Sequence, residues 1–378
     1  LLAAAVHAGV LMGLGSWLPL SLANPIGFLT ASVAGYLGHA LVTFREETGG
    51  RRFPRRWLLL QYAVNISVCS LLPLLDAPTV VLVFTPTALN ALIWNRAARV
   101  VLHQRQRSGC PAIHADDLGL DAGVDSAILE LAEAGRLTSA SLLVAGPTAP
   151  SAAAAWQSLA NTQPLVLHLC LTEGPQPQDC PDLPAGFGDL LLGSLRPAKR
   201  HALRAQVETA VQSQIHRFQQ LTGQRQIHLD GHQHVHLLPL VLEVVLEQRE
   251  IVWVRTTAEP LPQGLPLTLW IKALNNGGLL KWLVLQSLTW LARRRLTHAG
   301  ISSNRRFAGV LFTGQMAGVA LEAAQESLGD GDLLLAHPAA PVSTNQLMQR
   351  HFHRSAEFFS SPWRQHEWNA LKARAPHG

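Results

Sequence analysis

The chain has 378 residues, 48% of them hydrophobic, and a formal net charge of +5. Its length allows more than one domain, and its four cysteines contain no Cys-x-x-Cys pair that would indicate a redox motif or a zinc site. Residues 1–109 contain nine arginines and only three acidic residues, so the positive net charge of the chain comes from this region. No stacking or basic-groove motif accompanies it, and we expect no nucleic-acid partner.

Apolar runs dominate the first part of the chain, at about 1–22, 24–44, 57–75 and 77–95. Each is near the roughly 20 residues that a helix needs to cross a bilayer. Both arginine clusters would lie on one side of four spans, and the positive-inside rule makes that side the cytoplasm. The pattern predicts an integral protein of the cytoplasmic membrane, with spans in 1–108 and a second domain, 109–378, on the cytoplasmic side. Helices buried in a soluble bundle are the alternative.

Short motifs accompany these runs: Asn24-Pro25, Gly35-Tyr36-Leu37, Thr43-Phe44, Asn90 and Asn95-Arg96. With the number of runs, they resemble the GtrA-like family of four-span membrane proteins. That resemblance implies a link to polyprenyl-linked sugars and to membrane lipid. Because the chain starts at Leu1 rather than methionine, we expect that some N-terminal sequence is missing.

Strand patterns alternate with helical patterns after residue 110. The predicted strands are 110–115, 137–144, 164–171, 226–232, 251–255, 308–312 and 331–336. The predicted helices between them are 123–134, 148–160, 198–221, 238–248 and 316–328. Such alternation makes a parallel sheet, so the fold class is α/β, here a (β/α) barrel. Barrels of this kind assemble active sites at the carboxyl ends of their strands.

The densest cluster of metal-ligand residue types is the run 226–236, in which His228, Asp230, His232, His234 and His236 occupy alternate positions. In one extended strand all five would share a face. Imidazole is a common metal ligand, and a neighbouring carboxylate fixes its tautomer. A solvated loop or a chance cluster would give the same composition.

Two further segments hold candidate ligands. Asp116 and Asp117 follow a short apolar strand and precede Gly119, and His168 lies in the apolar run 165–171. An aspartate pair is also typical of a helix N-cap, and a lone strand histidine is usually a core residue. Glu173 follows His168 at the start of a proline-rich loop that is well placed to border a site.

In chain order these motifs resemble the YdjC-like (ChbG/HpnK) family of metal-dependent carbohydrate deacetylases, over about residues 110–360. Val252 to Thr256, the segment 300–309 with Phe307 and Gly309, and the strand end at His337-Pro338 agree with it. The sequence departs from the family's usual residues at Leu118, Val166 and Ala339. None of these departures removes a candidate ligand, so they concern how the substrate fits more than the hydrolysis.

The resemblance implies hydrolysis of the N-acetyl group of an amino sugar. Asp117, His168 and His232 would hold one divalent metal ion, either magnesium or zinc, with manganese as a further candidate. Asp116 would be the general base, and His337 or His234 the acid that protonates the amine. Arg255, His236 and Glu173 would contact substrate. Which of the three histidines in 232–236 is the ligand stays open on residue grounds.

The GtrA-like resemblance makes a polyprenyl- or hopanoid-linked N-acetyl sugar the expected substrate, at the cytoplasmic membrane face. One alternative is a membrane protein that transports or flips a sugar lipid and whose C-terminal domain binds sugar without turnover. Another is a glycoside hydrolase, which needs a second carboxylate across the bond, and the sequence shows no obvious partner for the aspartate pair. The oligomeric state is open.

Overall fold

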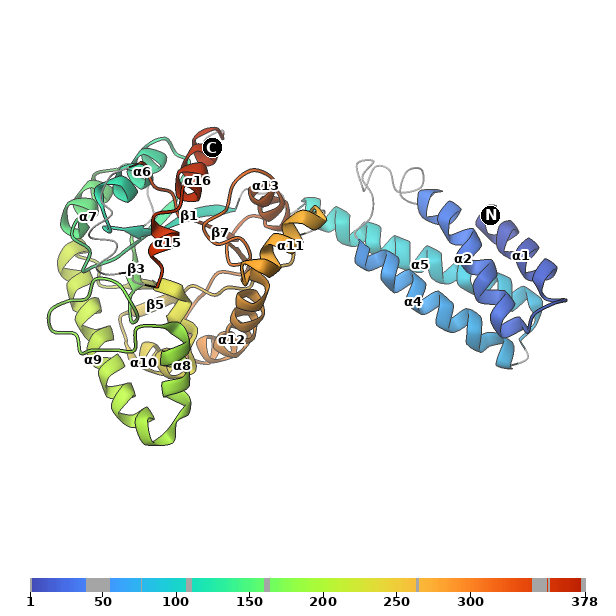
Figure 1. Ribbon diagram of the computed structural model, residues 1–378, viewed down its shortest axis with the longest axis horizontal. Coiled ribbons are helices and arrows are strands. Elements are labelled where there is room, and N and C mark those ends of the chain that lie inside the picture. Colours follow the sequence, from blue (N-terminus) through green and yellow to red (C-terminus); the bar gives the residue numbers. More distant parts are fainter. Residues whose placement is uncertain are drawn as a thin grey trace. The chain divides into compact units, whose positions relative to one another are not determined.

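The computed structural model describes residues 2–38, 55–75, 77–106, 111–159, 164–262, 265–341, 352 and 354–374. The chain divides into two units, Leu1–Ser108 and Gly109–Gly378, and Figure 1 labels their helices and strands.

Helices make up the described part of the first unit. They are α1 (Leu2–Leu14), α2 (Leu20–Gly38), α4 (Arg55–Leu71), the 3₁₀ turn η2 (Leu72–Leu75) and α5 (Thr79–Gln106). Polar side chains also join these helices in the interior. The His7 Nε2 atom lies 2.8 Å from Asn24 Oδ1, and the Asn24 amide donates to Cys69 O over 2.8 Å.

Within the described residues, no helix combines the length and apolarity needed to cross a membrane. The predicted location as an integral membrane protein is therefore wrong. In two of the runs counted as spans, the helix ends before the apolar run does. Helix α1 has 13 residues and ends at Leu14, before a turn, and α4 ends at Leu71, where a 3₁₀ turn follows. The end of the predicted second span and the basic segment after it, residues 39–54, lie outside the described part.

A seven-stranded parallel sheet forms the centre of the second unit, in the order β5-β4-β3-β2-β1-β7-β6. Its strands are β1 (Ala112–Leu118), β2 (Ser139–Leu142), β3 (Val166–Leu169), β4 (Ile227–Gly231), β5 (Ile251–Val254), β6 (Phe307–Ala308) and β7 (Leu333–Ala336). Each strand contains residues of a predicted strand. The apolar runs seen in the sequence are those expected of parallel strands that are covered on both faces.

The sheet is curled, and the two edges are linked by the chain segment that precedes β6. Ser302 pairs with Trp253 of β5 in an isolated parallel bridge, and a few residues later Phe307 pairs with Leu333 of β7. The predicted parallel α/β architecture is confirmed. In the described residues, however, the sheet is a curled half-barrel, with this single bridge in place of a continuous strand that would close it.

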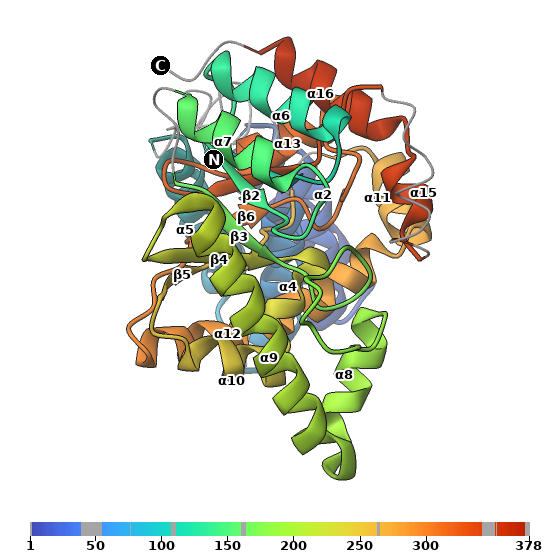
Figure 2. The ribbon, with the colours of Figure 1, turned by 90° about the vertical axis from the view of Figure 1, so that its left-hand side faces the viewer.

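The helices of the second unit lie around the outside of the curled sheet (Figures 1 and 2), except for α15, whose Phe359 and Phe358 rings pack against His232 and His337. They are α6 (Ala122–Glu133), α7 (Ala149–Ser158), α8 (Phe187–Leu195), α9 (Pro197–Thr222), α10 (Pro239–Glu247), α11 (Leu267–Asn275), α12 (Gly278–His298), α13 (Gly318–Ser327), α15 (Ala356–Phe359) and α16 (Trp363–Lys372). The five predicted helices correspond to α6, α7, α9, α10 and α13. The first of them begins where predicted because Asp121 caps it, accepting from the backbone amides of Gly123 and Val124.

Candidate active site

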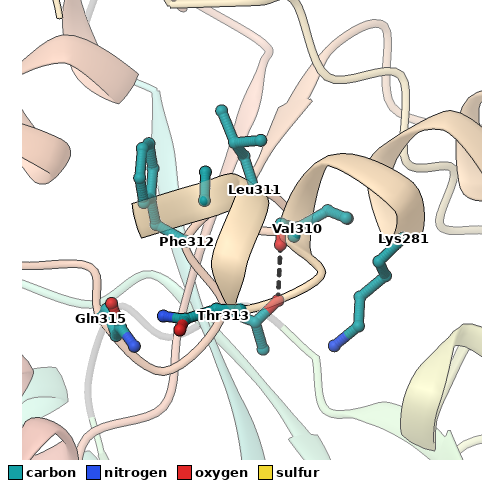
Figure 3. A pocket seen from close by; sticks show the side chains of 9 residues that line it. Lys281, Val310, Leu311, Phe312, Thr313 and Gln315 are labelled. Carbon is teal, nitrogen blue, oxygen red and sulfur yellow. Dashed lines mark hydrogen bonds between the residues drawn. The ribbon is translucent and has the colours of Figure 1, made fainter. Parts of the chain in front are cut away.

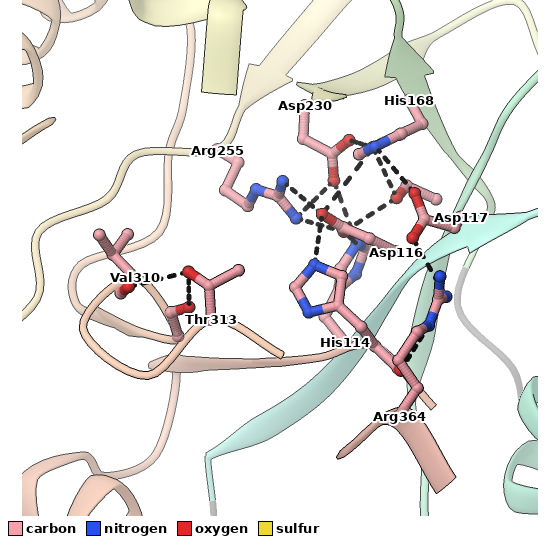
Figure 4. A network of polar contacts seen from close by, with 12 residues as sticks. His114, Asp116, Asp117, His168, Asp230, Arg255, Val310, Thr313 and Arg364 are labelled. Atoms are coloured by element: carbon pink, nitrogen blue, oxygen red, sulfur yellow. Dashed lines mark hydrogen bonds and ion pairs between the residues drawn. The ribbon is translucent and has the colours of Figure 1, made fainter. Parts of the chain in front are cut away.

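The candidate residues meet at the carboxyl ends of adjacent strands (Figure 4). Asp116 and Asp117 lie at the end of β1, His168 lies in β3 and Asp230 in β4, and Arg255 and His337 follow β5 and β7 directly. Parallel strands end at the same edge of a sheet, so residues far apart in the sequence come together there. All of these side chains are at least nine-tenths buried.

Asp117, His168 and His232 form the group best suited to a metal ion, because one ligand atom from each lies within 4.8 Å of the other two. His168 Nε2 lies 3.6 Å from Asp117 Oδ1. The Nε2 atom of His232 is buried and has no hydrogen-bond partner among the described residues. A buried ring nitrogen without a partner costs free energy unless a ligand satisfies it, so these residues can hold a metal ion.

A second group, His114, Asp116 and Asp230, adjoins the first and likewise consists of histidine and aspartate side chains. Here the Arg255 guanidinium already supplies the positive charge. It binds both oxygens of Asp116, over 2.6 and 2.9 Å, and also lies 2.9 Å from Asp230 Oδ2. His114 Nε2 lies 3.1 Å from the same Asp230 oxygen. The positive charge of Arg255 therefore already neutralises the carboxylates of this group.

Asp230 connects the two groups. His168 Nδ1 lies 2.6 Å from Asp230 Oδ1, which leaves His168 Nε2 directed at Asp117. A carboxylate on one ring nitrogen fixes the tautomer of the other and raises its basicity as a ligand. Asp230 lies in the histidine run, where a neighbouring carboxylate was expected to fix an imidazole tautomer, but the run did not indicate that its partner is His168.

Burial and charge shift the pKa values in opposite directions across the site. Burial raises the pKa of the Asp116 carboxyl, but the charges of Arg255 and His168 outweigh burial and hold it well below its ordinary value. For Asp117, burial is the larger effect and raises the pKa, although Arg364 and His168 oppose it. Burial lowers the pKa values of His232 and His337 to about 3, so both imidazoles are neutral at neutral pH.

The histidine run is not one extended strand, and this prediction is wrong. Strand β4 ends at Gly231, and His232–Leu237 form a 3₁₀ turn, η3, in which Gln233 and His234 have φ of 53° and 58°. Left-handed backbone at non-glycine residues is strained and is typical of functional sites. The turn separates the three histidines, which would share one face only in a continuous strand.

Only His232 of the three faces Asp117 and His168. His234 packs edge-on against the Phe307 ring at 5.8 Å between centroids, and its Nδ1 has no partner. His236 Nε2 lies 2.8 Å from Arg255 O and must be the donor there, because a carbonyl oxygen only accepts. His236, which was predicted to contact substrate, is thus fully buried and supports the backbone of Arg255.

Glu173, the third predicted substrate contact, is buried against the C-terminal segment. Its carboxylate accepts from the Arg354 backbone amide over 2.7 Å, from the Ser355 hydroxyl and from the Gln233 side chain. It therefore joins the loop after β3 to residues that cover the site. His337 remains beside the predicted base, with its Nε2 3.9 Å from Asp116 Oδ2.

The C-terminal segment supplies residues that the sequence analysis did not find. Arg364 donates to Asp117 Oδ2 over 3.2 Å and to His337 O over 3.1 Å. The Glu367 carboxylate accepts from the backbone amides of Met316 and His337, over 2.7 and 2.6 Å. His114 was also missed, although its place two residues before Asp116 on β1 gives both side chains the same face.

The chain is similar in sequence to several known proteins. The chain is 37% identical to a carbohydrate deacetylase of Mus musculus over 173 residues, which cover 43% of this chain and 54% of that protein. It is 34% identical to a carbohydrate deacetylase of Brevibacillus brevis over 145 residues, 36% of this chain and 54% of the relative. A chitooligosaccharide deacetylase of Serratia marcescens is 31% identical over 158 residues, 42% of this chain and 58% of the relative.

The chain thus spans little more than half the length of these curated relatives. The sequence profile of the YdjC-like protein family matches residues 112–376, which include every residue of the site described above. The match does not include residues 1–108, and the GtrA-like resemblance predicted there has no support. With most of its length matched, the chain belongs to the YdjC-like protein family.

Proposed function

We propose that the site removes the acetyl group from an N-acetylated amino sugar by hydrolysis, with a divalent metal ion held by Asp117, His168 and His232. The observation that carries the proposal is the buried His232 Nε2, which has no hydrogen-bond partner among the described residues, beside the Asp117–His168 pair. Relatives named as carbohydrate and chitooligosaccharide deacetylases support the substrate class.

Two imidazoles and one carboxylate suit zinc, and magnesium and manganese also accept such a set. When bound, the ion would supply Lewis acidity to the acetyl carbonyl and to the attacking water. Burial of the Asp117 carboxyl raises its pKa, and a bound cation would favour the ionised form.

Asp116 is the residue best suited to accept the proton of the attacking water. The Arg255 guanidinium keeps its carboxylate ionised and fixes both oxygens, so the base is oriented before substrate arrives. The water oxygen bonds to the acetyl carbon, and its proton passes to Asp116.

His337 then completes the proton transfer. Its Nε2 atom lies 3.9 Å from Asp116 Oδ2, which is too far for a direct hydrogen bond. One bridging water would therefore carry the proton from the carboxyl to the imidazole, which would pass it to the departing nitrogen. The C–N bond breaks to release acetate and the free amine. His234, the other predicted acid, has no ring nitrogen within 4 Å of the Asp116 carboxylate among the described residues, which favours His337.

The lipid linkage predicted from the sequence depended on membrane spans, and no contact of the described residues supports it. The substrate of this proposal is therefore an N-acetylated amino sugar without a specified carrier. The alternative of sugar binding without turnover has the same ligands but gives the Asp116–Arg255 pair no chemical role.

Acetate release from N,N′-diacetylchitobiose tests the proposal. The protein is stripped with a chelator and resupplied with zinc, magnesium or manganese, and Asp116→Asn is measured beside it. We expect metal-dependent release by the wild-type protein, and a loss of about 10²–10⁴-fold in Asp116→Asn with metal binding retained. Equal release by Asp116→Asn would remove its role as base. Metal binding without acetate release from any N-acetyl sugar would favour binding without turnover.

A further inference from the structure

A small hollow opens beside the loop that follows β6, apart from the candidate metal ligands. It has a volume of about 50 Å³ and is lined by residues of α11, α12 and the segment 310–315. Figure 3 shows Lys281 of α12 on one side and Gln315 and Thr313 of the loop on the other.

The polar side chains that line the hollow include one cation and two amides, all of which carry N–H donors. The Lys281 ammonium forms no ion pair within the described residues, and the surrounding protein lowers its pKa through burial although the side chain stays accessible to solvent. An accessible yet desolvated charge is expected inside a concave surface. The side-chain amides of Asn276 and Gln315, both on the lining, make no hydrogen bond to described residues.

The walls of the hollow are held rigidly by Glu259. Its carboxylate accepts from the backbone amides of Gly309, Val310 and Leu311 over 2.9 to 3.0 Å. Its backbone carbonyl accepts from Trp282 Nε1 of α12 over 3.0 Å. One buried residue thus fixes the loop and the helix on either side, and the hollow exists before any ligand binds.

The same elements lead directly to the candidate active site. Glu259 lies four residues after Arg255, and Phe307, two residues before Gly309, touches the His234 ring. The loop that lines the hollow therefore adjoins the candidate active site.

Size and charge together select the ligand group. One buried water needs about 10–15 Å³ of cavity volume. A hollow of about 50 Å³ therefore holds roughly three to five non-hydrogen atoms, too few for a sugar ring. One uncompensated cation with amide donors matches a single negative charge on oxygen. A dianionic phosphate monoester would leave one charge without a partner in a desolvated place.

We propose that this hollow, lined by Lys281, Asn276 and Gln315, binds a singly charged oxyanion carried by the substrate, a carboxylate or a phosphodiester. The inference rests on the proposed deacetylation and specifies its substrate class as an acidic N-acetyl sugar. Lys281 is a specificity residue here and takes no part in the hydrolysis itself.

Selectivity among three N-acetyl sugars tests the proposal: neutral N,N′-diacetylchitobiose, N-acetylmuramic acid with its carboxylate, and the methyl phosphodiester of N-acetylglucosamine 1-phosphate. For each, kcat/KM is measured for the wild-type protein, Lys281→Met, Lys281→Arg and the control Lys272→Met. Lys272 lies over the Trp363 ring and is not part of the hollow. We expect Lys281→Met to lower the ratio of acidic to neutral kcat/KM by about tenfold or more, through KM.

Lys281→Arg should restore most of that ratio, and Lys272→Met should leave it unchanged. Which acidic sugar loses more in Lys281→Met identifies the source of the oxyanion. An unchanged ratio in Lys281→Met would overturn the proposal. If no sugar is deacetylated, the proposed function fails separately. Calorimetry of N-acetylmuramic acid with the full chain then tests the hollow independently of turnover. Binding weakened by Lys281→Met supports the proposed oxyanion site, and equal binding rejects it.

Discussion

Arg364 donates from Nη2 to the Asp117 carboxylate over 3.2 Å, although 247 positions separate the two residues. The same guanidinium lies 5.4 Å from the Phe358 ring and 5.1 Å from the Phe359 ring. Asp117 itself has a φ of 73°, so its backbone is strained where its side chain is held. The C-terminal segment is therefore part of the candidate metal site, because it fixes the free oxygen of a proposed ligand.

Replacing Arg364 by glutamine should weaken metal binding by about 10–100-fold, because the orientation of Asp117 would no longer be fixed. Equilibrium dialysis with zinc or manganese measures this without any assay of turnover. Arg354→Gln is the matched control, since its guanidinium pairs with Asp189 at the surface. Equal affinities in the two variants would show that Arg364 does not position the ligand.

Replacing Asp230 by asparagine should lower the free energy of unfolding by roughly 3–5 kcal/mol. The Arg255 charge is fully buried, and the change removes one of its two carboxylate partners as well as the partner of His168 Nδ1. Urea unfolding measures the loss. Asp189→Asn, which alters an exposed pair, should cost less than about 1 kcal/mol. A similar small loss in Asp230→Asn would show that water or another group replaces its contacts.

The contribution of Glu259 and Glu367 to stability should fall as the pH rises from about 4.5 to 7. Burial raises the pKa of both Glu259 and Glu367 to about 7, against opposing backbone hydrogen bonds. At these two carboxyls the folded protein thus binds more protons than the unfolded chain in this window, and their stabilisation is complete below pH 4.5 and lost through pH 7. Each carboxyl contributes up to about 3 kcal/mol.

Urea unfolding at a series of pH values checks this trend in wild-type protein and Glu259→Gln. The free energy of unfolding of the wild type minus that of Glu259→Gln should fall across this range, whereas the same difference for Glu250→Gln, at an exposed position, should stay constant. A difference for Glu259→Gln that rises between pH 5 and 7 would contradict the direction of the Glu259 shift.

Replacing Gly309 by alanine should destabilise the protein by roughly 2–3 kcal/mol. Gly309 has a φ of 142°, and an added Cβ would lie 2.6 Å from Leu335 Cβ on β7. The variant should also disturb the Glu259 contacts that hold the loop. Thermal unfolding compares it with Gly188→Ala, where a Cβ meets nothing within 4 Å. Equal melting temperatures would mean that the loop and β7 adjust without cost.

The local pattern of the sequence was enough to predict the elements of the second unit. Apolar runs such as 165–171 indicate buried parallel strands, and their alternation with helical periods indicates the α/β class. The rule that parallel strands end together was enough to bring Asp116, Asp117, His168, Arg255 and His337 to one edge. Each of these inferences depends on properties within a few residues of the chain.

The same local reasoning failed where neighbours in space decide the structure. An apolar run gives no sign of where its helix stops, and the turns after Leu14 and Leu71 end two of the runs that were read as spans. The alternation of residues 228–236 suited a strand, yet the chain turns after Gly231, so only His232 meets Asp117 and His168.

The sequence by itself determined the order of the elements and which residue types stand at the strand ends, because both depend on short-range periodicity. Only the tertiary structure decided that Arg255 neutralises Asp116 and Asp230 together, that Asp230 orients His168, and that Arg364 reaches Asp117. The physical reason is that a buried charge takes its partner from whichever distant segment packs against it, and that packing depends on the whole chain.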